Sequence, residues 1–191
     1  MASKTTGERM RVAVDRATLH DVSGIYSLLL ANKKDTSLVQ RSRKDIQANI
    51  RDFVVATDDK GRLLGCTALH FYTPTMAEET SLALSPLAHG KGIGPRLIEA
   101  TETLAKERGV EKLLLVTPRP EYFARLGYKR VSWLRLPKAV LTAKLRQVMA
   151  QSPSRWIPYL FWQSNVMERR ALDGDRERVA PSRTQNPSLA R

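Results

Sequence analysis

Two periodicities of apolar and polar positions divide the chain into expected strands and helices. Alternation, or a β-branched apolar run, predicts strands at residues 11–16, 53–57, 62–72, 78–85, 113–117 and 128–134. Apolar residues at helical spacing predict helices over 25–30, 43–49, 95–107 and 138–150, with a helical turn at 121–126. These elements follow one another closely, which predicts one compact domain.

Cap and turn residues mark the expected ends of these elements. Asp21 and Ser42 are predicted to cap the first two helices through their side-chain oxygens. Pro95 suits the first position of the third helix, where its missing N–H costs nothing. Glycine supplies the positive φ expected in the turn at 58–61 and just beyond two helices, at Gly61, Gly109 and Gly127.

Composition limits the class of protein. A chain of 191 residues that is 42% hydrophobic can bury the core of one domain. The formal net charge of +13 favours an anionic partner, such as a nucleotide, a nucleic acid or a membrane surface, without choosing among them. No apolar stretch approaches the length of a membrane span, so no membrane partner is expected.

The single cysteine and the few histidines restrict the chemistry further. Cys66 is the only cysteine, so no intrachain disulfide can form, and a reducing, cytoplasmic location is expected. Its apolar surroundings in the sequence favour a buried, inert thiol over a nucleophile. None of the three histidines is spaced from Cys66 or a carboxylate as metal ligands are, so no metal is expected.

The two ends of the chain differ in composition from the rest. Residues 1–10 are expected to form a flexible N-terminus, and the domain is expected to span 11–165. Its last part, 131–165, reads as a helical and aromatic extension in which Trp156 to Trp162 packs on the domain. Residues 166–191 are charged and then rich in Pro, Ser and Arg, which predicts a disordered basic tail.

A glycine-rich loop between a predicted strand and a predicted helix carries the strongest functional signal. Gly90, Gly92 and Gly94 let the backbone approach a ligand closely, and the following helix adds unpaired N–H groups and a positive dipole end. This arrangement predicts a pyrophosphate site with Lys91 at its rim. The spacing fits neither a Rossmann fingerprint nor a Walker A loop. A turn that serves only chain geometry is the alternative.

The segment from His89 to Gly94 resembles motif A of the GNAT superfamily of acetyltransferases, Arg/Gln-x-x-Gly-x-Gly/Ala, with His89 in the place of Arg or Gln. The order of elements over residues 11–131 is also similar to that family. The resemblance implies an α+β fold with a mixed, mostly antiparallel sheet of six to seven strands, flanked by helices and splayed after the fourth strand. It implies acetyl-CoA as co-substrate. The residues expected to contact it are Ala83, Leu84, His89, Gly90, Lys91, Gly92, Ile93, Gly94, Pro95 and Phe123.

Several segments are similar, more narrowly, to the acetyltransferase domain of N-acetylglutamate synthases. They are residues 38–42, 65–69, 78–86 and 115–117, with the pairs at 122–123 and 127–128. This resemblance implies an amino-acid N-acetyltransferase of arginine biosynthesis that acts on an α-amino group such as that of glutamate. Synthases of that group often carry an amino-acid-kinase-like domain in front, so this chain would be a short, stand-alone member or a relative with a different substrate.

The resemblance also implies catalytic residues. Glu78, at the start of the strand before the loop, is the candidate base for an α-amino group, whose pKa is about 8. Glu79 should face the opposite side of the strand. For both, a solvated edge carboxylate is the alternative. The oxyanion donor is expected to be a backbone N–H near Leu84, freed by a strand bulge.

The proton donor to the departing thiolate is less clearly indicated. Many GNAT enzymes have a Tyr five residues before the position of Tyr128, where this chain has Phe123. Tyr122 is one residue away and is the lesser candidate. A thiol with a pKa near 8.5 can leave without a side-chain acid, which is the reading we prefer.

Arg41 is the candidate for binding the carboxylate of an amino-acid acceptor, because a guanidinium forms a bidentate fork. Arg119 is a second option, and Thr117 is expected to line the cleft. Surface arginines and a core threonine are the alternatives.

Other acceptors and another class of protein stay open at this point. The acceptor could instead be a protein N-terminus, a lysine or a polyamine. A catalytically silent acyl-CoA sensor is an alternative of another class, and the charge alone suggests a nucleic-acid-associated protein as a further one. Nucleic acid is not expected as a partner, because the aromatic run at 156–162 holds no cation. Assembly as a homodimer is left open.

Overall fold

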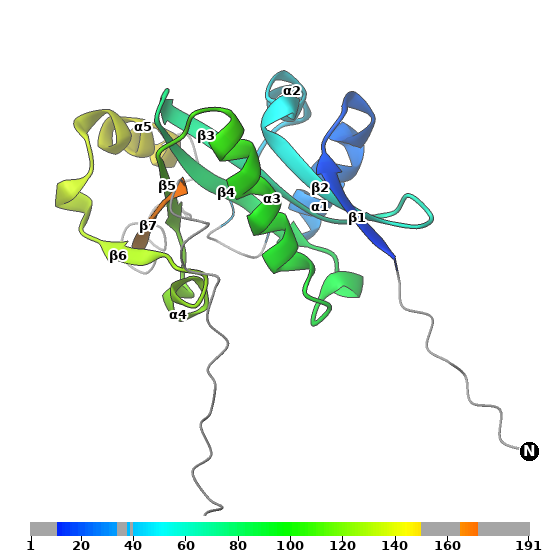
Figure 1. The fold of residues 1–191 in the computed structure, drawn as a ribbon. Helices are drawn as coiled ribbons and strands as arrows, with labels where there is room; N and C mark the ends of the chain where they lie inside the picture. The colour runs from blue at the N-terminus through cyan, green and yellow to red at the C-terminus, as the bar shows by residue number, and fades with distance from the viewer. Residues whose placement is uncertain (1–10, 34–37, 39, 150–164, 172–191) are drawn as a thin grey trace, which may run out of the picture.

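The structure, a computed structural model, describes residues 11–33, 38, 40–149 and 165–171. Seven strands form one mixed sheet in the order β1-β2-β3-β4-β5-β7-β6 (Figure 1). The strands are β1 Val12–Arg16, β2 Phe53–Asp58, β3 Leu63–Thr73, β4 Met76–Leu84, β5 Lys112–Val116, β6 Lys129–Val131 and β7 Val166–Arg170. The helices are α1 Val22–Ala31, α2 Arg43–Ala48, α3 Ile93–Glu107, α4 Pro120–Ala124 and α5 Lys138–Met149. Short 3-10 turns lie at Leu19–Asp21, Ile50–Asp52, Pro86–Ala88 and Trp133–Arg135.

Strand β7 corrects one prediction. The disordered tail expected from residue 166 is wrong for its first residues, because Val166–Arg170 pairs antiparallel with both β5 and β6. Val166 and Met167 are buried in the sheet, and they supply apolar contacts that the charged composition of the segment conceals. The fold class is confirmed: an α+β fold with a mostly antiparallel sheet of seven strands.

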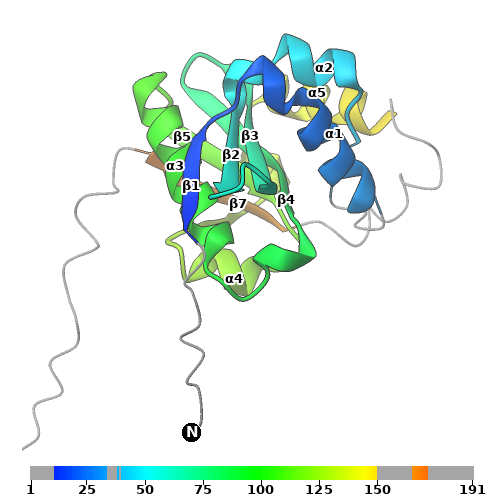
Figure 2. The ribbon, with the colours of Figure 1, turned by 90° about the vertical axis from the view of Figure 1, so that its right-hand side faces the viewer.

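Helices cover both faces of the sheet (Figure 2). On one face α3 packs through an apolar stripe, and its core includes Leu97, Ile98 and Leu104. On the other face lie α1 and α2, with a second core that includes Ile25 and Phe53. Helix α5 covers a third, smaller cluster against β5 and β7. The thiol of Cys66 is buried, as predicted, and burial raises its pKa to about 12.

The predicted helix starts are partly confirmed. Ser42 caps α2, because its Oγ accepts from the backbone N–H of Asp45 at 3.1 Å. Asp21 makes no side-chain cap to α1; it accepts from the N–H and Oγ1 of Thr18 in a reciprocal capping box one turn earlier. Helix α3 begins at Ile93, so Pro95 is its third residue rather than its first.

Two irregularities in β4 shape the centre of the sheet. Strand β4 runs parallel to β5, but the pairing covers only Met76 to Glu78 opposite Lys112 to Leu114. Beyond Glu78 the residues of β4 no longer pair with β5, and this separation is the splay that the resemblance implies. In the same strand, one extra residue stands opposite β3 between Thr80 and Ala83, and Ser81 there has a φ of 58°.

The C-terminal extension is described in part. The strand predicted at 128–134 is shorter, β6 Lys129–Val131, and ends in a 3-10 turn. The helix predicted at 138–150 is α5. The aromatic run at 156–162, the N-terminal residues 1–10 and the rest of the tail from 172 lie outside the described residues. None of the helices among the described residues has the length and apolar character needed to cross a membrane.

Candidate active site

The glycine-rich loop lies between β4 and α3, with a 3-10 turn at Pro86–Ala88 in front of it. Gly90 and Gly92 have φ of 72° and 71°, which L side chains rarely adopt, and open space surrounds the position of a Cβ at both. Backbone conformation therefore requires these two glycines. Gly94 differs: a Cβ there would make ordinary contacts at 3.6 Å with Leu84 and Tyr122.

The loop offers backbone donors at the start of α3. The N–H groups of Ile93 and Gly94 belong to the first helical turn and have no partner within the helix. Two other backbone N–H groups of the loop already have partners: that of His89 donates to the Pro86 carbonyl and that of Lys91 to the Ala88 carbonyl, each at 3.4 Å. The exposed side chains of His89 and Lys91 remain at the rim.

Tyr122, the lesser candidate for the proton donor, is a neighbour of this loop. A Cβ on Gly94 would lie 3.6 Å from the Tyr122 hydroxyl, so Tyr122 on α4 faces the start of α3. Burial, and then the charge of Glu79, raise the pKa of Tyr122. Phe123, the next residue, is buried in the core on the α3 face, edge-on to both Tyr122 and Tyr128.

The bulge of β4 does not lie where it was predicted. The bulge is predicted near Leu84, but the extra residue and the positive φ are at Ser81. Leu84 stands in regular register opposite Gly65, and Ala83 opposite Cys66. A bulge is governed by cross-strand register, which a single strand sequence does not record.

Glu78 is buried beside two donors that the sequence argument missed. Nζ of Lys144, on α5, lies 2.5 Å from Oε1 of Glu78, and the two side chains are 6% and 4% exposed. The hydroxyl of Tyr72 on β3 donates to Oε2 of Glu78. Glu78 is therefore no solvated edge carboxylate, and α5 contributes directly to this part of the molecule.

Glu79 lies on the opposite face of β4, as predicted, and it is also buried. It accepts from the hydroxyl of Tyr128 at 3.0 Å and from that of Thr67 at 3.4 Å. Burial raises the pKa of Glu79 to about 8, and the charge of nearby Glu102 adds to the rise. The same burial raises the pKa of Tyr128 well above its ordinary value.

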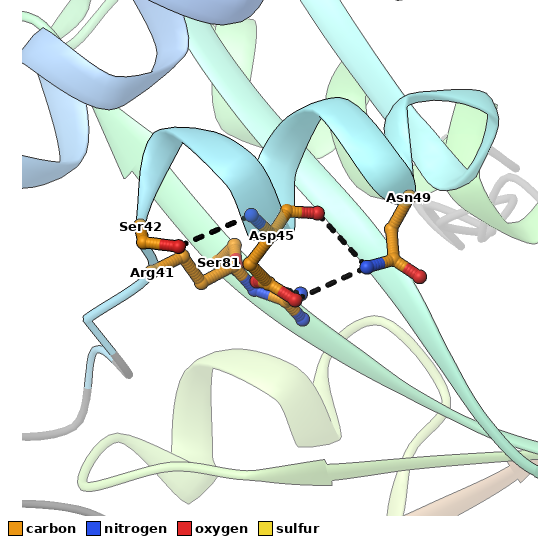
Figure 3. Close-up of polar contacts among 5 residues, drawn as sticks. All are labelled: Arg41, Ser42, Asp45, Asn49 and Ser81. Atoms are coloured by element: carbon orange, nitrogen blue, oxygen red, sulfur yellow. Dashed lines mark hydrogen bonds and ion pairs between the residues drawn. The ribbon is translucent and has the colours of Figure 1, made fainter.

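Arg41 bridges α2 and β4 (Figure 3). Its Nε donates to Oγ of Ser81 at 3.0 Å, and its Nη1 forms an ion pair with Asp45 at 3.0 Å. The guanidinium lies 5.5 Å from the centre of the Phe53 ring, and the Arg41 side chain is only 9% exposed. It is therefore no ordinary surface arginine, whereas the predicted Arg119 side chain is exposed.

Next to Arg41, the buried side-chain nitrogen of Gln40 has no hydrogen-bond partner among the described residues. Thr117 is buried, and its Oγ1 accepts from the backbone N–H of Arg119 at 3.0 Å, while its own N–H donates to the Asn165 carbonyl. Core packing and this turn account for the contacts of Thr117.

Polar side chains, some buried and some partly exposed, gather on the α2 and α5 side of β4. Burial lowers the pKa of His70. The charges of Glu78, Arg41, Lys144 and Asp45 also act on this pKa. We call this set the β4 polar cluster, defined as Arg41, Asp45, His70, Tyr72, Glu78, Ser81 and Lys144. The sequence signals for its members are weak, because they come from α2, β3, β4 and α5. Within the described residues, no group of three or more His, Cys, Asp or Glu side chains is arranged to hold a metal ion.

The fold agrees with comparisons to known proteins. The model of the acetyltransferase (GNAT) family matches residues 22–130, and the chain belongs to this family. An uncharacterized N-acetyltransferase of Chlorobaculum tepidum is 36% identical over 127 residues, which are 66% of this chain and 81% of that protein. An amino-acid acetyltransferase of Ralstonia nicotianae is 34% identical over 140 residues, 72% of this chain but only 30% of the relative.

Solved structures give the same fold. N-acetylglutamate synthase from Neisseria gonorrhoeae, complexed with coenzyme A and N-acetyl-glutamate, superposes with a TM-score of 0.68 at 26% identity. The match covers 86% of this chain and 36% of that one. The protein Rv2747 from Mycobacterium tuberculosis, in complex with CoA, has a TM-score of 0.70 at 22% identity over 83% of this chain and 98% of its own. This second likeness concerns the fold alone.

Proposed function

We propose that this protein transfers the acetyl group of acetyl-CoA to the α-amino group of an amino acid, of which glutamate is the leading candidate. The observation that carries the proposal is the β4 polar cluster, where a buried arginine and a buried carboxylate lie on one side of the strand that precedes the glycine-rich loop. An amino-acid acceptor carries a carboxylate that can pair with the arginine and an amine that can pair with the buried carboxylate. A role in arginine biosynthesis in the cytoplasm belongs to the same proposal.

Acetyl-CoA is the co-substrate in this proposal. The residues proposed to contact it are those of the loop from His89 to Pro95, together with Ala83, Leu84 and Phe123. The positive φ of Gly90 and Gly92, the open space around them and the first-turn N–H groups of α3 support an anion at this position. The splay beyond Glu78 supports an acyl arm between β4 and β5.

Glu78 is the proposed base. An α-amino group with a pKa of about 8 is largely protonated at neutral pH, so a carboxylate that accepts its proton raises the fraction of reactive amine. The buried position of Glu78, the last residue of β4 that pairs with β5, supports this role. When an acceptor amine arrives, Lys144 either moves away from the Glu78 carboxylate or shares it with the amine.

Arg41 is the proposed partner of the acceptor carboxylate. It is buried, held by Ser81 and Asp45, and flanked by the unpaired amide nitrogen of Gln40, which a carboxylate oxygen would satisfy. Two other residues are weaker candidates. Arg119 is exposed, and the hydroxyl of Thr117 already accepts a hydrogen bond in the turn at 117–119.

A thiol-release assay tests the proposal. Acetyl-CoA is offered with a panel of amino acids, polyamines and peptides, and CoA release is followed for each acceptor. We expect the fastest release with an amino acid, and a rise of about tenfold or more in the acceptor KM for Arg41→Met. The exposed Arg51 serves as the matched control, and Arg51→Met should leave the KM unchanged. Faster release with a polyamine or peptide would contradict the amino-acid acceptor.

A further inference from the structure

The ammonium of Lys144 lies where an acceptor amine would have to lie. Its Nζ is 2.5 Å from the Oε1 of Glu78, within direct proton-transfer distance of the proposed base. Both side chains are almost fully buried, so this amine is held beside the carboxylate rather than visiting it from solvent. Lys144 is 66 positions from Glu78 and reaches it only because α5 folds back over β3 and β4.

The same carboxylate marks the point where the sheet opens. Glu78 is the last residue of β4 that pairs with β5, opposite Leu114. The proposed function brings the thioester of acetyl-CoA into this opening. A buried lysine therefore shares the end of the splay with the reacting carbonyl, and the acyl group is delivered from within the cleft, so Lys144 needs no access to bulk solvent.

We propose that Lys144 is an acetylation site within the protein's own active site: when no acceptor is bound, its ε-amine takes the acetyl group from acetyl-CoA. This inference rests on the proposed function, because it uses the same co-substrate and the same base. Proximity raises the rate of this transfer, because an amine held beside a base reacts with the bound thioester as in an intramolecular reaction.

The transfer balances as follows. The Lys144 ammonium gives one proton to Glu78, and the neutral amine attacks the thioester carbonyl carbon. The new C–N bond forms as the C–S bond breaks, and CoA departs as a thiolate that takes the second proton lost from the nitrogen. The products are N-acetyl-lysine and CoA-SH, and Glu78 later returns its proton to solvent.

The modification would have a consequence for the site. Acetylation removes the positive charge of Lys144 and with it the ion pair to Glu78. The acetyl-lysine side chain then fills the position that an acceptor amine needs. Protein that has been incubated with acetyl-CoA alone should therefore transfer acetyl groups to an added acceptor more slowly than fresh protein.

Peptide mapping by mass spectrometry tests the inference on the full chain. Wild-type protein is incubated with acetyl-CoA without acceptor, and the acetylated fraction is compared at Lys144 and at Lys138, an exposed lysine of the same helix. We expect the rate at Lys144 to exceed that at Lys138 by about tenfold or more. Excess CoA should suppress acetylation at Lys144 but not at Lys138, and Glu78→Gln should suppress it selectively. The CoA competition keeps the test valid if that variant folds poorly.

The outcomes separate this inference from the proposed function. Thiol release with an amino acid, together with no acetyl group on Lys144, overturns the inference and leaves the function standing. Acetylation of Lys144 at the rate of Lys138, or acetylation that excess CoA does not suppress, also overturns it, because surface chemistry would then explain the label. If neither thiol release nor acetylated Lys144 is observed, both the inference and the proposed function are overturned.

Discussion

The Nε of Arg41 donates a hydrogen bond to the Oγ of Ser81, and Ser81 is the one described non-glycine residue with a positive φ. A left-handed conformation costs an L residue about 1–2 kcal/mol, so it persists only where the surroundings hold it. The bulge at Ser81 thus turns β4 near the splay and presents a hydroxyl to the guanidinium. This hydrogen bond therefore links the strained backbone at Ser81 to the position of Arg41, the proposed acceptor-binding residue.

Two substitutions at Ser81 separate strain from hydrogen bonding. Both Ser81→Ala and Ser81→Gly remove the hydroxyl, but only glycine relieves the positive φ of 58°. We expect Ser81→Gly to be more stable than Ser81→Ala by about 1 kcal/mol, which corresponds to roughly 2–4 °C in Tm for a protein of this size. Both variants should raise the acceptor KM to a similar extent, because each releases Arg41. Equal Tm values for the two would contradict the strain.

The glycines of the loop should respond differently to alanine. At Gly92, where φ is 71°, Gly92→Ala should destabilise the fold by about 1 kcal/mol and weaken CoA binding by about tenfold. At Gly94, inside α3, a Cβ meets only ordinary contacts, so Gly94→Ala should stabilise the protein by up to about 0.5–1 kcal/mol and keep its CoA affinity. Thermal unfolding and calorimetric titration with CoA measure both effects. A loss of CoA affinity in Gly94→Ala would show that the ligand needs the space of that missing Cβ.

Glu79 should make stability depend on pH. Its pKa is raised by burial from 4.5 to about 8 in the folded protein, so between these values the folded state holds a proton that the unfolded state has released. Stability contributed by this group is therefore lost as pH rises through that window. Glu79→Gln should flatten the fall in Tm between about pH 5 and pH 8.

The difference between wild type and variant isolates this effect, because His70, with its pKa lowered by burial, has the opposite dependence. The exposed Glu111 offers a matched control, and Glu111→Gln should keep the wild-type slope. If Glu79→Gln keeps the wild-type slope of Tm against pH, the proton held by the folded state is not on Glu79.

Local signals explain what the sequence could predict. Periodicity and glycine positions are set by neighbouring residues, so the loop, the strands and most helices appear within a few residues of their predicted places. Strand β7 was missed because its five residues include three charged ones and its burial depends on partners far along the chain. The ion pair of Glu78 with Lys144 and the burial of Glu79 are products of tertiary packing, and carboxylates are usually exposed.

Tyr122 should be dispensable for proton transfer. Its hydroxyl faces the start of α3, and its raised pKa keeps the phenol protonated, so it is placed to donate. The leaving thiol has a pKa near 8.5, however, and can depart as a thiolate without help. We expect Tyr122→Phe to lower kcat by far less than the roughly 100-fold that loss of a general acid costs. A loss of that size or larger, with CoA affinity unchanged, would identify Tyr122 as the proton donor.

The role of Glu78 as base requires a variant that also accounts for its ion pair. Glu78→Gln alone removes the buried carboxylate that pairs with the ammonium of Lys144, which should destabilise the protein by about 3–5 kcal/mol. The double variant Glu78→Gln with Lys144→Met removes both charges and should recover most of that stability. Comparison of Tm for wild type, single and double variants tests this, and a double variant as unstable as Glu78→Gln would mean that the pair does not act as a unit.

Kinetics of the double variant then report on the base itself. If Glu78 accepts the amine proton, kcat should fall mainly below about pH 8, where the α-amino group is protonated, and the loss should shrink at higher pH. The single variant Lys144→Met keeps the carboxylate and provides the comparison for it, and acetyl-CoA affinity should be unchanged in both variants. A pH profile of the double variant that parallels wild type would remove Glu78 from the proton path. In that event, the buried carboxylate would serve only to hold Lys144 and α5 against the sheet.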